Sequence, residues 1–209
     1  MERQSQAYDA AAVLLDRAGQ LAQEHQFVAL GQQIAFERGN LLANRGNLQA
    51  ALSAFAEALH LAEASTNPVS TAMARNNLAY HTLLTGDVAQ AQRHIDSAVG
   101  LTERYALSFL WQYVSSTAGE IALARGELDS ADAAFERAFE VARAWDNRVH
   151  MANLRINQAL VAQARNNWSR ARELLEAAQT VFGDAIDPVV RDKIARVSTE
   201  LFAHGPADR

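Results

Sequence analysis

The strongest pattern in the chain lies in residues 126–139, which read GELDSADAAFERAF. Similar stretches begin at Gly46, Gly86 and Asn166, so the pattern returns every 40 residues without an insertion. Each aligned column keeps one class of side chain, either apolar or small. The apolar columns are Leu48, Val88, Leu128 and Trp168, and Phe55, Ile95, Phe135 and Leu175; the small columns are Ala51, Ala91, Ala131 and Ala171, and Ala58, Ala98, Ala138 and Ala178. Four matches in every column indicate an internal repeat.

Each column of the repeat has a physical reason. A helix commonly ends at a residue in the left-handed backbone conformation, which Gly adopts without strain and Asn, the residue of the fourth copy, tolerates. The small and large residues that follow, at spacings of three and four, form one face of a second helix. Alanines on that face let two helices approach closely, and the large residue between them fills the groove of the neighbour. The repeat therefore predicts two antiparallel helices joined by a tight turn.

Composition excludes several classes of protein. The 209 residues include 43 Ala but only 10 Gly and 3 Pro, a balance that favours helices over sheets. The chain has no Cys, which excludes disulfides, thiol nucleophiles and thiolate metal sites. Its net charge of −5 has the wrong sign for a nucleic-acid-binding surface. The N-terminus does not resemble a signal peptide and no apolar run approaches the ~18 residues that span a bilayer, so we expect a cytoplasmic chain without nucleic-acid or membrane partners.

The register of the repeat accounts for the whole chain, residues 1–209, as one domain. It predicts a half repeat, four full repeats and a terminal helix, over residues 1–26, 27–66, 67–106, 107–146, 147–186 and 187–203. Together these segments predict about ten helices. Because a repeat buries its apolar face only against its neighbours, the opening half repeat has two interpretations. The chain is either a piece of a larger protein, or its first helix is a native cap.

The pattern resembles the tetratricopeptide repeat, whose second helix carries Ala, a large apolar residue and Ala at this spacing. The small residue of the first helix also matches, at Gly39, Ala79, Gly119 and Ala159. The aromatic residue of that helix is replaced by Arg75, Ser115 and Arg155, and for the arginines we expect ion pairs with a neighbouring helix. Units of about 40 residues are similar to those of kinesin light chains and of the sensor regions of bacterial regulators. The resemblance implies an all-α, right-handed superhelical solenoid of antiparallel helix pairs.

The sequence contains no recognisable catalytic or cofactor-binding constellation. Its six histidines lack metal-ligand spacing, and the acidic residues are scattered as surface charge on helices. No Gly-rich loop that could bind phosphate is present. We therefore predict a protein that is not an enzyme, with no catalytic residue, no metal site and no cofactor.

The first helices of the repeats are the candidate binding surface, because in such a solenoid they line the concave side. The 40-residue period projects a face rich in Asn, Tyr and Gln onto that side. The residues that we assign to a peptide-binding groove are Gln33, Glu37, Asn40, Met73, Asn76, Asn77, Tyr80, Tyr113, Thr117, Glu120, Asn153 and Asn157. The same exposed face is expected to include Phe36, Ser116, Ile156 and Leu160.

The asparagines of this face suggest how a peptide is bound. An Asn amide carries a donor and an acceptor, so it can pair with the backbone of an extended peptide. The stretch Asn76-Asn77-Leu78-Ala79 resembles the kinesin light chain repeat, and this resemblance implies contact of the Asn with peptide cargo. The alternative is that these side chains bond between adjacent helices and hold the stack together.

The function expected from these features is a non-enzymatic scaffold that binds a protein or peptide in its concave groove. The alternative is a sensor region of a larger bacterial signalling or transcriptional regulatory protein, which binds an effector or other domains of its own parent protein. A third hypothesis is a homo-oligomer formed through the incomplete terminal repeats, where Tyr8, Leu14 and Leu15 are expected to be exposed.

Overall fold

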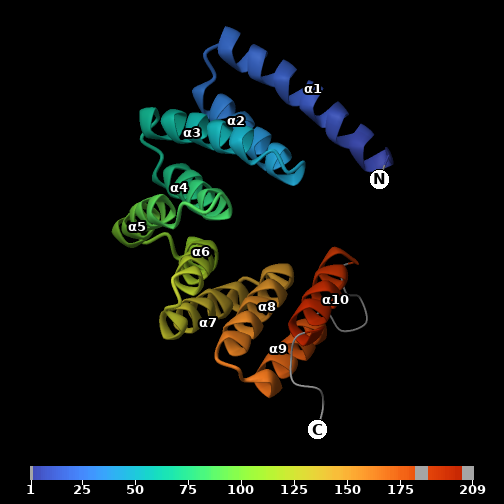
Figure 1. The fold of residues 1–209 in the computed structure, drawn as a ribbon. Helices are drawn as coiled ribbons and strands as arrows, with labels where there is room; N and C mark the ends of the chain where they lie inside the picture. Colours follow the sequence, from blue (N-terminus) through green and yellow to red (C-terminus); the bar gives the residue numbers. More distant parts are fainter. Residues whose placement is uncertain (1, 182–187, 204–209) are drawn as a thin grey trace. The chain divides into compact units, whose positions relative to one another are not determined.

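The computed structural model describes residues 2–181 and 188–203, which form ten α-helices and a short 3₁₀ turn (Figure 1). The elements are α1 (Glu2–Glu24), α2 (Val28–Asn44), α3 (Leu48–Ala64), α4 (Pro68–Leu84), α5 (Val88–Arg104), η1 (Ser108–Leu110), α6 (Trp111–Ala124), α7 (Leu128–Ala144), α8 (Arg148–Ala164), α9 (Trp168–Thr180) and α10 (Pro188–Ala203). Consecutive helices pack in pairs, α2 with α3, α4 with α5, α6 with α7 and α8 with α9. Since these described ranges contain no strand, the predicted all-α fold of helix pairs is confirmed.

The helices fall into two compact units. Unit 1 comprises residues 1–107 with α1 to α5, and unit 2 comprises residues 108–209 with η1 and α6 to α10. The terminal helix predicted at 187–203 corresponds to α10, and residue 187 lies outside the described residues. Among the described helices we find none with the length and hydropathy of a membrane-spanning segment.

The turn inside each repeat ends one helix and begins the next within two residues. Gly46, Gly86 and Gly126 have φ of 76°, 88° and 76°, and Asn166 has φ of 57°, so the predicted left-handed residue is confirmed in all four repeats. After α2, the Asn47 N–H donates to the Leu42 carbonyl at 2.9 Å, which satisfies a carbonyl at the helix end. The Asn47 side chain then accepts from the N–H of Ala50 at 3.2 Å and caps α3.

The turns between repeats use the same left-handed conformation without glycine. The residues concerned recur every 40 positions and are Gln26, Thr66, Ala106 and Asp146, with φ between 49° and 55°. A residue with a Cβ is strained in this region by about 1–2 kcal/mol. The fold therefore imposes the conformation at these positions against the preference of the local sequence.

The repeat columns form the core of each helix pair. Phe55 and Phe135 are fully buried, and each ring lies against the glycine of its partner helix. A Cβ added to Gly39 would lie 2.5 Å from the Phe55 ring, and one added to Gly119 would lie 2.6 Å from the Phe135 ring. The two repeats with Ala in this column carry a smaller partner, and these pairs are Ala79 with Ile95 and Ala159 with Leu175. The small and large columns thus match each other in size.

Ion pairs connect neighbouring helices on the surface. Arg75 pairs with Glu63 at 2.8 Å, and Arg155 pairs with Glu136 at 2.9 Å. These contacts confirm the ion pairs predicted for the two arginines that replace an apolar residue of the repeat. The carboxylates lie on α3 and α7, which immediately precede α4 and α8 in the chain.

Candidate functional site

In unit 1 the first helices α2 and α4 enclose a shallow groove of about 370 Å³. Its lining residues are Ala29, Gln32, Gln33, Phe36, Glu37, Asn67, Ser70 and Met73. Three of them, Gln33, Glu37 and Met73, belong to the predicted site. Phe36 also makes an edge-on contact with the buried Phe55 ring at 5.7 Å, so the groove is anchored on the core of the repeat. The groove combines apolar side chains with amide and carboxylate groups.

The other predicted residues of unit 1 lie further along the same helices. Asn40 donates to Glu37 at 3.2 Å within α2. On α4 the amide of Asn77 donates to the Met73 carbonyl of its own helix at 3.3 Å. Asn76 is half-buried, and its Oδ1 atom is buried without a hydrogen-bond donor among the described residues. Tyr80 is half-buried with its ring edge-on to His81 at 5.0 Å.

In unit 2 three of the predicted residues, Glu120, Asn153 and Asn157, form a polar cluster shared by α6, α8 and α10. The Asn157 amide donates to Glu120 Oε1 at 3.0 Å, from α8 to α6. Burial raises the pKa of Glu120 to about 7, although the Asn157 hydrogen bond and the charge of Lys193 both act to lower it. Such a shift marks a carboxylate whose surroundings compensate its charge incompletely.

Lys193 on α10 completes this cluster. Its Nζ atom donates to Asn153 Oδ1 at 2.7 Å, while the Asn153 amide donates to the Val149 carbonyl at 3.0 Å. Burial lowers the pKa of Lys193, and the charge of Glu120 opposes that shift. Sequence reasoning did not assign Lys193 to the site, yet it lies 40 residues after Asn153. The repeat period extended by one helix would have identified it.

A second polar network joins the start of α8 to α6. The Asn147 amide donates to Gln112 Oε1 at 2.8 Å and to the Tyr113 hydroxyl at 3.3 Å. His150 Nε2 lies 2.7 Å from the Gln112 carbonyl oxygen, and its ring lies 5.1 Å from that of Tyr113. Tyr113 and Asn157 therefore bond between adjacent helices, which is the structural role that the sequence left open as an alternative.

Part of the face expected to be exposed is buried. Thr117 is 4% exposed and Asn157 is 9% exposed, and Ser116 and Ile156 are buried as well. The expected exposure of these four residues is wrong because α8 contacts α6 and α10 in addition to α7 and α9. The 40-residue period alone predicts the same exposed face for every first helix and does not include these additional helix contacts. A direct contact of Thr117 or Asn157 with a peptide remains a prediction.

The N-terminal helix also exposes apolar side chains. Leu14 and Val13 are 68% and 67% exposed, whereas Tyr8 and Leu15 are half-buried. The expected exposure at this end thus holds for Leu14 and only partly for Tyr8 and Leu15. The homo-oligomer proposed on this basis stays a prediction.

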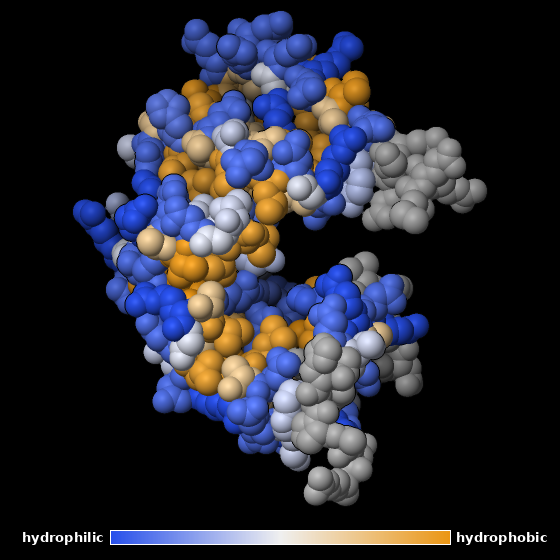
Figure 2. All heavy atoms as spheres, viewed as in Figure 1, coloured by the Kyte–Doolittle hydropathy of each residue, from blue (hydrophilic) through white to orange (hydrophobic). Residues whose placement is uncertain are grey.

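The surface chemistry is mixed in both units. Figure 2 shows apolar areas interrupted by hydrophilic side chains on the visible face of each unit. Within the described residues, no group of three or more Asp, Glu or His side chains is placed to hold a metal ion. The described first helices carry hydrogen-bonding, charged and apolar side chains.

No family model and no curated protein sequence matches the chain. Its structure is similar to the crystal structure of BtubC (BKLC) from P. vanneervenii, a protein of the tetratricopeptide type. The TM-score is 0.68 at 17% sequence identity, and the match covers 99% of this chain and 79% of that chain. At this identity the likeness concerns the fold. The chain accordingly has a tetratricopeptide-like fold built of helical repeats.

Proposed function

We propose that the chain is a non-enzymatic scaffold that binds an extended peptide segment of a partner protein on its first helices. The observation that carries the proposal is the groove between α2 and α4, which contains Gln33, Glu37 and Met73 together with Phe36. Its apolar side chains can cover those of a peptide, and its polar groups can pair with the peptide backbone. Such a surface gains affinity from many contacts on a preformed wall.

The polar cluster of unit 2 supports the same proposal. Glu120, Asn153 and Lys193 present a carboxylate, an amide and an ammonium group on three successive first helices. Because Glu120 is incompletely compensated, a donor group supplied by a peptide would stabilise its ionised form. We assign this cluster to the binding of a polar peptide segment within unit 2.

The experiment begins with the selection of binders from a displayed library of random decapeptides, with the full chain as bait. The affinity of each enriched peptide is then measured for the Gln33→Ala/Met73→Ala variant. Truncation of two groove side chains should weaken binding by about tenfold or more. Gln49→Ala is the matched control, since Gln49 is an exposed residue of α3 outside the groove, and should bind as the wild type does.

Two outcomes contradict the proposal. One is a selection that enriches no peptide. The other is an enriched peptide that binds the Gln33→Ala/Met73→Ala variant as tightly as the wild type. Circular dichroism of each variant establishes that a lost affinity does not reflect an unfolded protein.

A further inference from the structure

The groove between α2 and α4 is accessible along its lining and contains a single charged side chain. Its eight lining residues are all exposed or half-buried, so a ligand can reach each of them. Seven of them are neutral, and the eighth is Glu37 on α2. The surroundings of this carboxylate therefore decide which charge a bound segment should carry.

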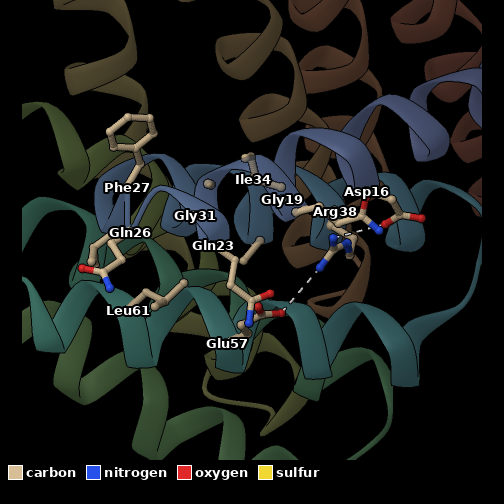
Figure 3. A pocket seen from close by; sticks show the side chains of 14 residues that line it. Asp16, Gly19, Gln23, Gln26, Phe27, Gly31, Ile34, Arg38, Glu57 and Leu61 are labelled. Carbon is tan, nitrogen blue, oxygen red and sulfur yellow. Dashed lines mark hydrogen bonds and ion pairs between the residues drawn. The ribbon is translucent and has the colours of Figure 1, made fainter.

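The two arginines of these helices are paired with carboxylates outside the groove. Apart from Glu37, the Asp, Glu, Lys and Arg residues of α2 and α4 are Arg38 and Arg75. Arg38 contacts Asp16 on α1 and Glu57 on α3, with nitrogen–oxygen distances of 3.1 Å and 3.6 Å (Figure 3). Arg75 pairs with a carboxylate of α3 at 2.8 Å. Neither arginine lines the groove, so neither is placed to compensate Glu37.

Glu37 itself has a neutral partner. Within the part of the chain that the structure describes, its carboxylate forms no ion pair and accepts a hydrogen bond from the Asn40 amide at 3.2 Å. Arg38 follows Glu37 directly in the chain, but the two carboxylates of Asp16 and Glu57 outweigh its single positive charge. This part of α2 therefore carries a net negative charge, and a cationic group of a bound segment would complement it.

Apolar side chains lie beside Glu37 in the groove. Phe36 precedes Glu37 on α2, and Met73 lines the groove from α4. Both are half-buried, which leaves part of each side chain for a ligand to cover. In an extended peptide, side chains two residues apart point to the same face and lie about 7 Å apart. An apolar and a basic side chain at this spacing can therefore contact Phe36 and Glu37 together.

We propose, on the basis of the peptide-binding function proposed above, that the groove selects segments in which Lys or Arg stands two positions from an apolar residue. The apolar side chain packs on Phe36 and Met73, and the cation pairs with the Glu37 carboxylate. The amide groups of Gln32 and Gln33 pair with the peptide backbone. Because an exposed ion pair contributes modestly, the basic residue should improve affinity by about two- to fivefold.

The test repeats the decapeptide selection with the full-length variants Glu37→Gln and Glu103→Gln. Glu103 is an exposed residue of α5, so its variant is the matched control. Both variants lose one negative charge, so a general attraction of the acidic chain for basic peptides affects them equally. Wild type and Glu103→Gln should enrich Lys or Arg two positions from an apolar residue, and Glu37→Gln should not. Circular dichroism establishes that each variant is folded.

Affinities of one enriched peptide provide the second arm of the test. Replacement of its basic residue by norleucine should weaken binding to the wild type by about two- to fivefold, and replacement by Glu should weaken it further. The Glu37→Gln variant should bind the basic and the norleucine peptides alike. In about 1 M salt, where charges are screened within about 3 Å, the preference of the wild type for the basic peptide should decrease.

The outcomes separate this specificity from peptide binding itself. Enriched peptides without a basic residue at this spacing, or with Asp or Glu there, would overturn the specificity and leave the peptide-binding function standing. A preference for the basic peptide that is unchanged in Glu37→Gln would overturn the assignment of Glu37. A selection that enriches no peptide contradicts the proposed function, and the specificity is then refuted with it.

Discussion

At the scale of single residues, the spacing of each helix pair depends on one contact between the small and the large column. In the third repeat the Phe135 ring occupies the space that a Cβ on Gly119 would need. The fourth repeat has Ala159 and Leu175 at the same two positions. A smaller residue at one position thus accompanies a larger residue at the other. The effects of substitutions at the two positions on stability should therefore be coupled.

Substitution of Gly119 tests this coupling. Gly119→Ala should lower the free energy of unfolding by about 1–3 kcal/mol, because the added Cβ must displace the Phe135 ring. In a Phe135→Leu background the same change should cost clearly less, since the pair then matches that of the fourth repeat. A double-mutant cycle measured by urea denaturation gives the coupling energy. An equal cost in both backgrounds would show that the ring does not require the glycine.

Glu120 predicts a pH dependence of stability. Its pKa is about 7 in the folded chain against 4.5 for an ordinary Glu, so the folded state holds the proton more tightly than the unfolded state. This contribution to stability is fully present below pH 4.5 and is lost as pH rises through 7. Glu120→Gln should therefore raise the free energy of unfolding at pH 8 by up to about 3 kcal/mol and change it much less at pH 5.

Urea denaturation of wild type and Glu120→Gln at the two pH values measures this effect. Glu103→Gln is the control, because Glu103 is an exposed residue of α5. Its effect should be small and alike at both pH values. A small effect of Glu120→Gln that is alike at both pH values would contradict the prediction, because it would show that the pKa of Glu120 is not raised in the folded chain.

The residues of the repeat could be predicted from the sequence more fully than those of the site. Gly46 and Asn166 were identifiable because a helix end restricts the residue type that it accepts. The burial of Asn157 could not be predicted from the sequence, because it depends on the packing of α6 and α10 beside α8.

At the scale of elements, the two kinds of turn have the same geometry but different residues. The turns within repeats have Gly46, Gly86 and Gly126 at the left-handed position, where glycine is unstrained. The turns between repeats have residues with a Cβ, and Thr66 is the β-branched member of that group. A β-branched residue at positive φ is especially unfavourable, so this turn stores strain.

Replacement of Thr66 should release that strain. Thr66→Gly is expected to raise the free energy of unfolding by about 1 kcal/mol, because glycine adopts the conformation without a steric cost. The exposed side chain contributes little that would be lost. Gly86→Thr, the reverse change at the equivalent turn within a repeat, should lower stability. Thermal and urea denaturation measure both, and a loss of stability in Thr66→Gly would contradict the prediction.

At the scale of the whole molecule, contacts run mainly between helices that are neighbours in the chain. The pairs α2 with α3 and α6 with α7 illustrate this pattern in unit 1 and unit 2. In such an array stability is approximately the sum of repeat and interface contributions, so damage to one repeat should stay local.

A large-to-small change in one repeat tests local unfolding. Phe135→Ala removes a fully buried side chain at a cost of about 3–5 kcal/mol. Hydrogen exchange should accelerate in α6 and α7 while protection in α2 and α3 stays close to that of the wild type. A uniform acceleration across all four helices would show that the chain unfolds as one cooperative body.

Peptide binding by the first helices is tested most directly by mapping an enriched decapeptide onto the ¹⁵N-labelled chain. We predict saturable shifts of the amides of Gln33, Phe36 and Met73, which line the groove between α2 and α4. The amides of α3 and α5 that face away from this groove should shift little. Shifts confined to α3 and α5, with the groove amides unchanged at saturation, would contradict the assignment of the first helices as the binding surface.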